Sequence, residues 1–372
     1  MAVDPFAPIL ERYGIVILDG GLGTELEARG ADLRDPLWSA KVLVEDPERI
    51  REVHTAYFEA GADLAISASF QASFEGFASR GFDHDTAEGL MRRSVEVAQE
   101  ARAAWWHGRE PTGRPFPLVA ASVGPYGAVL GNGAEFTGDY DKDEDALVGF
   151  HVPRLLALAA AEPDVLACET IPSIVEARAL VRALELVPEV PAWVSFSCRN
   201  AAQLCDGSPF ELAVQTVAEA PSIVAVGVNC TAPTHVAGLV RIAAAATTRP
   251  VVAYPNRGAF WDAVRKVWVD PPAQDPRPPL RPAEWREAGA RLVGGCCGIG
   301  PLGIATIAQA LVSVSIWKPA DKPAAAGPQA VVSVPTGKST DVAAAVSQAL
   351  VLVSTEKSME EAADCPQSQV SA

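Results

Sequence analysis

Positive charge is scarce in this chain, and long apolar runs are absent from it. The 30 lysine and arginine residues face 46 aspartate and glutamate residues, giving a formal net charge of −16 at pH 7. Neutralising phosphates needs clustered basic side chains, so this balance argues against a nucleic-acid partner. No run of about 18 uncharged apolar residues occurs, so we expect no membrane span. The N-terminus lacks the basic start and apolar stretch of a secretory signal, and we expect a cytoplasmic protein.

Cysteine is sparse as well. Seven cysteines in 372 residues are an odd number in a long chain, unlike the dense framework of a small secreted domain. We therefore expect free thiols in a reducing compartment. A dinucleotide-binding fingerprint is also missing, because the glycines after the first predicted strand stand at 20, 21, 23 and 30 instead of in a Gly-x-Gly-x-x-Gly pattern.

Short apolar runs alternate with helix-like segments along most of the chain. Apolar strands that are each followed by a helix are typical of a parallel sheet covered by helices. Eight such units close a (β/α)8 (TIM) barrel, which we favour over an open doubly wound sheet. The predicted strands cover residues 14–20, 63–69, 117–122, 164–170, 192–197, 223–230, 250–256 and 291–297. The predicted helices cover residues 46–62, 86–106, 143–161, 173–187, 208–220, 233–247, 282–290 and 301–314, with Asp46 as an N-cap and Pro153 as a break or kink.

The composition changes near residue 317. Residues 318–372 are rich in Ala, Ser and Pro and contain no aromatic residue. We predict a catalytic barrel over residues 1–317 and a low-complexity, disordered C-terminal tail over 318–372.

Polar and thiol groups stand at the ends of the predicted strands, where barrel enzymes carry their catalytic groups. The three cysteines at 230, 296 and 297 end the sixth and eighth strands, which flank the seventh. Three thiolates with one open position suit a tetrahedral zinc ion that also binds a reactant. The alternatives are buried thiols that act as small hydrophobes, and a strained disulfide between the adjacent pair. We expect Cys168, Cys198, Cys205 and Cys365 not to be ligands.

Two carboxylates, Asp19 and Glu169, end the first and fourth predicted strands. Both can hydrogen-bond the ammonium group of an amino acid, and the backbone N–H groups of Gly20 and Gly21 can face its carboxylate. The alternatives are a turn or helix cap at Asp19 and a buried salt bridge at Glu169.

Several segments together resemble the homocysteine S-methyltransferases, in particular the bacterial and plant enzymes that use S-methylmethionine. The resemblance covers about residues 10–314 and is carried by residues 18–54 and by the motifs ASVGPYGA (121–128), ACET (167–170), GVNC (227–230), YPN (254–256) and GGCC (294–297). The family implies a zinc (β/α)8 barrel, in agreement with the reading of the residues themselves.

The resemblance also implies roles for single residues. Cys230, Cys296 and Cys297 would be the zinc ligands. Asp19 and Glu169 would hold the amino group of homocysteine, Gly20 would lie near its carboxylate, and Asn229 and Asn256 match rim positions. One departure stands out, because Gly298 occupies a position where the family often has arginine.

The chemistry implied is methyl transfer from a sulfonium donor to the homocysteine thiolate, which gives methionine. S-methylmethionine is the expected donor, and S-adenosylmethionine and a betaine are alternatives. A different class of function is a zinc- and amino-acid-binding barrel without catalysis. We expect small-molecule partners only, and a monomer or small homo-oligomer.

Overall fold

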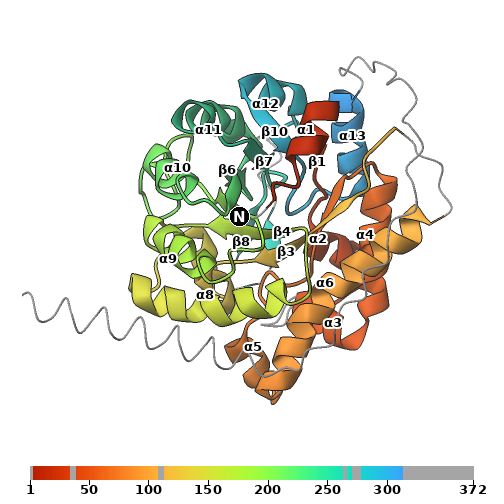
Figure 1. Ribbon diagram of the computed structural model, residues 1–372, viewed down its shortest axis with the longest axis vertical. Helices are drawn as coiled ribbons and strands as arrows, with labels where there is room; N and C mark the ends of the chain where they lie inside the picture. The colour runs from red at the N-terminus through yellow and green to blue at the C-terminus, as the bar shows by residue number, and fades with distance from the viewer. Residues whose placement is uncertain are drawn as a thin grey trace, which may run out of the picture. The chain divides into compact units, whose positions relative to one another are not determined.

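Eight parallel strands form the central barrel of the computed structural model (Figure 1). Their order is β1-β10-β7-β6-β5-β4-β3-β2, and a parallel bridge between Leu18 and Leu64 joins the first strand to the last. The predicted (β/α)8 barrel is confirmed. The strands are β1 (Val16–Ile17), β2 (Leu64–Ile66), β3 (Leu118–Val123), β4 (Val165–Ile171), β5 (Ala192–Phe196), β6 (Ile223–Asn229), β7 (Val251–Tyr254) and β10 (Ala290–Val293).

The structure describes residues 3–33, 39–107, 113–262, 265, 267–269 and 278–312. The predicted tail over 318–372 and its boundary near 317 lie outside these residues. Within them, no helix is both long and apolar enough to cross a membrane.

A ring of helices surrounds the barrel, one after each strand (Figure 1). The predicted start of α4 is confirmed, because Asp46 accepts a hydrogen bond from the Arg49 amide and Pro47 is the first helical residue. The expectation of a break at Pro153 is wrong, since α8 continues through it. The outer helices are α4 (Pro47–Glu59), α6 (His84–Trp106), α8 (Glu144–Ala159), α9 (Ile174–Leu184), α10 (Phe210–Ala218), α11 (Pro233–Ala246), α12 (Pro282–Ala288) and α13 (Pro301–Val312).

Short elements that the sequence patterns do not predict fill the loops. Most of them follow the carboxyl ends of strands, where they add walls to that end of the barrel. They are α2 (Leu22–Ala28), α3 (Ser39–Glu45), α5 (Phe74–Ala78), α7 (Tyr126–Leu130), the 3-10 helix η1 (Ala134–Phe136) and the antiparallel hairpin β8 (Phe260–Asp262) and β9 (Val267–Val269).

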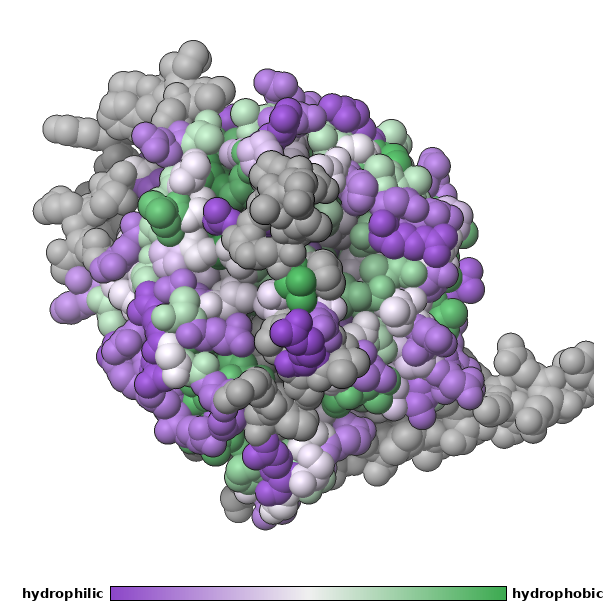
Figure 2. All heavy atoms as spheres, turned by 180° about the vertical axis from the view of Figure 1, so that it is seen from behind, coloured by the Kyte–Doolittle hydropathy of each residue, from purple (hydrophilic) through white to green (hydrophobic). Residues whose placement is uncertain are grey.

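The opposite end of the barrel is closed by the N-terminal segment. Phe6 precedes helix α1 (Ala7–Tyr13) and Ile9 lies within it. Both side chains pack into the core cluster with residues of the barrel strands. The ring of Phe6 lies 6.1 Å from that of Trp193, and both side chains are fully buried. Seen from behind, hydrophobic residues show only as scattered small groups among hydrophilic ones (Figure 2). The apolar core therefore fills the lower part of the barrel, opposite its carboxyl end.

Candidate metal and substrate site

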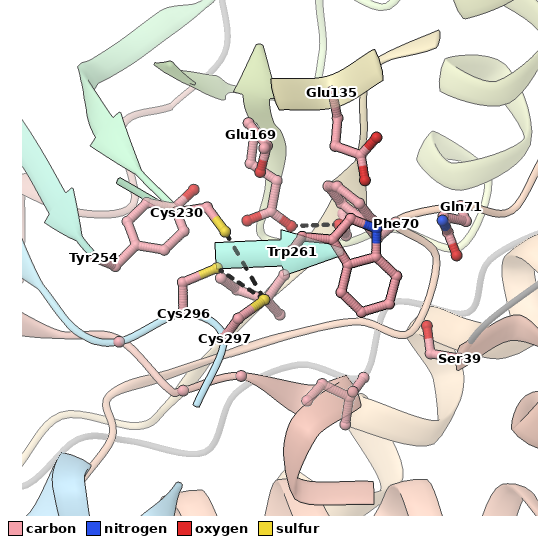
Figure 3. A pocket seen from close by; sticks show the side chains of 18 of the residues that line it. Ser39, Phe70, Gln71, Glu135, Glu169, Cys230, Tyr254, Trp261, Cys296 and Cys297 are labelled. Carbon is pink, nitrogen blue, oxygen red and sulfur yellow. Dashed lines mark hydrogen bonds between the residues drawn. The ribbon is translucent and has the colours of Figure 1, made fainter. Parts of the chain in front are cut away.

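The three predicted cysteine ligands meet at the carboxyl end of the barrel (Figure 3). Cys230 follows β6 directly, and the adjacent pair lies in the loop after β10 instead of inside the predicted strand. Since β6 and β10 both pair with β7, the two segments are close neighbours. The Cys297 sulfur lies 3.8 Å from that of Cys230 and 3.9 Å from that of Cys296.

These separations fit a metal ion. In a tetrahedral zinc site the metal–sulfur bonds of 2.3 Å place neighbouring sulfurs about 3.8 Å apart. All three sulfurs lie within 4.8 Å of one another, and in the described part of the chain they are the one group of three such ligands. Hydrogen bonds within the cluster lower the pKa of the Cys296 thiol well below its usual value, while the pKa values of Cys230 and Cys297 are raised, so one thiolate is favoured and shares the protons of the other two. The cluster can therefore bind a metal.

The backbone around the cysteines is held in unusual conformations. Cys230 has a φ of 45°, a left-handed conformation that costs a non-glycine residue free energy and is typical of functional sites. The Cys230 amide donates to the Tyr254 carbonyl at 3.1 Å, and the Asn256 side chain donates to the Cys230 carbonyl at 3.2 Å. In the second loop, Gly298 has a φ of 79° and its amide donates to the Thr24 hydroxyl at 2.9 Å. The local hydrogen bonds thus hold all three thiols on one side.

Both predicted carboxylates lie beside the cysteines. Asp19 is 1% exposed, and its Oδ2 accepts a hydrogen bond of 2.8 Å from the Ile66 amide, while no described residue pairs with its Oδ1. Glu169 accepts a hydrogen bond from the Ser122 hydroxyl. Burial raises the pKa of Glu169 to about 8 and that of Asp19 well above its usual value, and the negative charge of Cys296 adds to both shifts. A cation bound beside these two carboxyls would favour the ionised form of each, so the pair is suited to bind one.

Gly20 and Gly21 let the first loop pack against the metal loop. A side chain at Gly20 would lie 2.1 Å from the Ile299 carbonyl oxygen, and one at Gly21 would lie 2.7 Å from that of Cys296. Both glycines line the same pocket as the cysteines. The absence of a side chain is therefore required at both positions, whatever their backbone amides bind.

Asn229 lies deeper than the sequence analysis expects. It is fully buried, and its amide oxygen accepts from the Thr170 amide at 2.7 Å and from the Ser195 hydroxyl at 2.9 Å. Its amide nitrogen donates to the Thr170 hydroxyl at 2.7 Å. These contacts fix the end of β6 just before Cys230, and direct binding of substrate by Asn229 stays a prediction.

One pocket is lined by the three cysteines and Glu169 together with residues that the sequence analysis misses. Its empty space is about 1030 Å³, open mouth included. One wall carries Glu135 from η1, and another carries Trp261 and Trp268, which face each other across the β8–β9 hairpin. The clustered aromatic and β-branched residues at 260–261 and 267–269 are a strand signal that could have revealed the hairpin. Glu135 follows no predicted strand, so only the fold brings it here.

Comparison with known proteins settles the family. The family profile described as Homocysteine S-methyltransferase matches residues 16–311. The chain belongs to the homocysteine S-methyltransferase family. The resemblance and the enzyme class predicted from the sequence are confirmed.

Individual members of this family match over most of the chain. "Homocysteine S-methyltransferase YbgG" of Bacillus subtilis is 45% identical, covering 82% of this chain and 97% of that protein. "Homocysteine S-methyltransferase 4" of Zea mays is 47% identical, with 82% and 91% covered. The crystal structure of the homocysteine methyltransferase MmuM from Escherichia coli in its metallated form has a TM-score of 0.72 at 43% identity, with 82% and 98% covered.

The glycine at 298, where family members often have arginine, is accommodated by its surroundings. A Cβ at this position would lie 3.0 Å from that of Arg257, whose own amide donates to the Cys297 carbonyl at 2.9 Å. The positive φ of Gly298 also favours glycine over any other residue. The loop is therefore supported from Thr24 and Arg257 in this homocysteine S-methyltransferase, without an arginine at 298.

Proposed function

We propose that this protein transfers a methyl group from the sulfonium centre of S-methylmethionine to L-homocysteine, with zinc held by Cys230, Cys296 and Cys297. The observation that carries the proposal is the set of three sulfurs at about tetrahedral spacing, which line one pocket together with the buried carboxyl of Glu169. A thiol with an ordinary pKa near 8.5 is mostly protonated at pH 7 and a weak nucleophile. Zinc, when bound, supplies the charge that keeps the homocysteine sulfur deprotonated.

The chain's own residues orient the amino acid. The free Oδ1 of Asp19 and the carboxyl of Glu169 accept hydrogen bonds from the homocysteine ammonium, whose charge also favours their ionised forms. The backbone at Gly20 lies against the substrate carboxylate. These contacts direct the sulfur toward the cysteines, and holding both reactants in line contributes much of the rate.

The methyl transfer is a single displacement. A lone pair of the homocysteine sulfur forms the new sulfur–carbon bond while the sulfonium–methyl bond breaks, and its electron pair stays on the leaving sulfur. The leaving group is a neutral thioether, so no general acid is needed. The products are two molecules of methionine, and the thiol proton passes to solvent.

The test compares wild type with Cys297→Ser and with the control Cys205→Ser, the same substitution at a thiol outside the cluster. Zinc content is measured together with methionine formation from homocysteine and each of three donors: S-methylmethionine, S-adenosylmethionine and a betaine. We expect one zinc ion per chain and activity with S-methylmethionine in wild type and the control. Cys297→Ser should lose zinc and about 100-fold or more in kcat/KM.

Full activity in protein without zinc would overturn the proposal. If the enzyme preferred another donor, that donor would take the place of S-methylmethionine in the proposal, and the methyl transfer to homocysteine would stand. Binding of zinc and homocysteine without turnover would favour a binding barrel instead.

A further inference from the structure

Glu135 is a second buried carboxyl that lines the pocket, beyond Glu169. It is 7% exposed, and among the described residues its Oε2 has no hydrogen-bond partner. Its backbone is fixed, since the carbonyl of Glu135 accepts from the Ser197 hydroxyl at 3.0 Å. Among the described residues no lysine or arginine pairs with it, and burial raises the pKa of Glu135 to about 7. A buried carboxylate of this kind is stabilised by a bound group that donates a hydrogen bond and carries positive charge.

Glu135 lies on the other side of Glu169 from the three thiols in the view of Figure 3. The charge of Cys296 contributes to the raised pKa values of Asp19 and Glu169, whereas none of the three cluster cysteines affects Glu135. In the same view, the Glu135 carboxylate points toward the side of the pocket that holds Trp261. Homocysteine has only four bonds between its nitrogen and its sulfur. Its ammonium therefore matches Asp19, near the cluster, and leaves Glu135 free.

Aromatic rings surround this second part of the pocket. Trp261 and Trp268 lie with their ring centroids 5.4 Å apart, and Phe136 meets Trp268 edge-on at 6.2 Å. Phe70 lines the pocket with them. Faces of aromatic rings attract cations that have no N–H groups, which describes a sulfonium centre. The hydrogen-bonding cation that Glu135 requires must be a different group, and an ammonium is the natural one.

We propose that Glu135 binds the α-ammonium group of the methyl donor, so that the enzyme selects sulfonium donors that are amino acids. This inference rests on the proposed function, because it takes the donor to be a sulfonium compound. The reaction brings two amino acids together, and two buried carboxyls line the pocket: Glu169 beside the cysteines, and Glu135, whose Oε2 has no partner among the described residues. Each would hold one ammonium.

The experiment uses the zinc-loaded protein with two donors that share a sulfonium and a carboxylate. S-methylmethionine carries the α-ammonium, and dimethylsulfoniopropionate lacks it. Glu135→Gln is compared with wild type and with Glu219→Gln, the same change at an exposed position. We expect Glu135→Gln to lower kcat/KM for S-methylmethionine by about 10- to 100-fold, through KM, with no change for dimethylsulfoniopropionate. The KM for homocysteine should stay within about twofold of wild type.

An equal loss with both donors, no loss with either, or a raised KM for homocysteine would overturn the inference. Binding separates it from the proposed function. S-methylmethionine is titrated against the tryptophan fluorescence of wild type and Glu135→Gln, which needs no turnover. Weaker binding in Glu135→Gln alone supports the ammonium contact even if wild type makes no methionine, and equal affinity in both proteins overturns it.

Discussion

At the scale of single residues, the Oδ1 of Asp19 is an acceptor that the described chain leaves empty. Its other oxygen accepts a hydrogen bond from the Ile66 amide, which holds the side chain in place. The open acceptor supports the proposed contact with the homocysteine ammonium over the turn-forming role that the local sequence equally allows.

Asp19→Asn should raise the KM for homocysteine by about 10- to 100-fold, because an amide carries no charge and has only one oxygen, which cannot serve both the Ile66 amide and the substrate. The KM for the methyl donor should be unchanged. Steady-state kinetics with each substrate varied in turn measures both values.

Asp63→Asn is the matched control. Asp63 is also buried and also accepts from a backbone amide, that of Ile17 at 2.8 Å, but it lies at the amino end of β2 and pairs with Arg114. It should lower stability without changing either KM. A similar rise in the homocysteine KM in both variants would show that Asp19 acts through the fold alone.

At the scale of elements, the loops after β2 and β3 are tied to α8 by one side chain. Arg154 is fully buried, and its guanidinium donates to the carbonyls of Ala72 at 2.7 Å, Gly124 at 2.9 Å and Phe70 at 3.1 Å. Burial lowers the pKa of Arg154 to about 10, which leaves it charged at neutral pH. The rigid fork of arginine suits three carbonyls in a way that a single ammonium cannot.

Arg154→Lys should lower the free energy of unfolding by about 2–4 kcal/mol, because two of the three buried carbonyls lose their donor. The KM for the donor should rise as well, since the neighbouring side chains of Phe70 and Gln71 line the pocket. Urea unfolding and kinetics measure the two effects. The control is Arg182→Lys in α9, whose ion pairs with Glu144 and Asp145 are partly exposed and should matter by about 0.5 kcal/mol or less. Equal effects of the two variants would contradict this role.

At the scale of the whole molecule, His54 makes the fold sensitive to acid. It is fully buried in α4 and neither ring nitrogen has a partner in the described part of the chain, so burial lowers its pKa from 6.5 to about 4. Between pH 6.5 and about 4, the His54 ring binds a proton in the unfolded chain but stays neutral in the folded protein. Stability contributed by the neutral ring is therefore complete above pH 6.5 and falls as the pH drops toward 4, by about 3 kcal/mol in all.

His54→Met removes this titration and should flatten the acid side of the stability profile. Urea unfolding of wild type and variant between pH 7.5 and 4.5, both stripped of metal with a chelator, isolates the effect from proton-driven loss of zinc. The difference between the two free energies of unfolding should shrink or reverse as the pH falls. Parallel profiles would contradict the assignment.

Sequence patterns predict the architecture because a barrel is a repeated local signal. Each apolar strand and each amphipathic helix can be recognised in its own window, and Asp46 and Pro47 mark a helix start without reference to anything distant. Cys230, Cys296 and Cys297 can also be found this way, since they follow strands that the order of a barrel places on either side of β7. Likewise, Asp19 and Glu169 stand at strand ends.

The tertiary structure alone decides what surrounds those residues. Glu135, Trp261 and Trp268 come from irregular segments with no fixed direction in the sequence, and they meet only because the loops fold over the carboxyl end of the barrel. Burial is likewise a property of the whole fold. The local sequence around Asn229 therefore does not reveal that its side chain supports β6, and the sequence around His54 does not reveal that no described residue pairs with its ring. Strand and helix periodicity is local, and it determined the barrel and the places of the three clustered cysteines. Desolvation and long-range contacts are not, and they determined which polar atoms are left for a substrate.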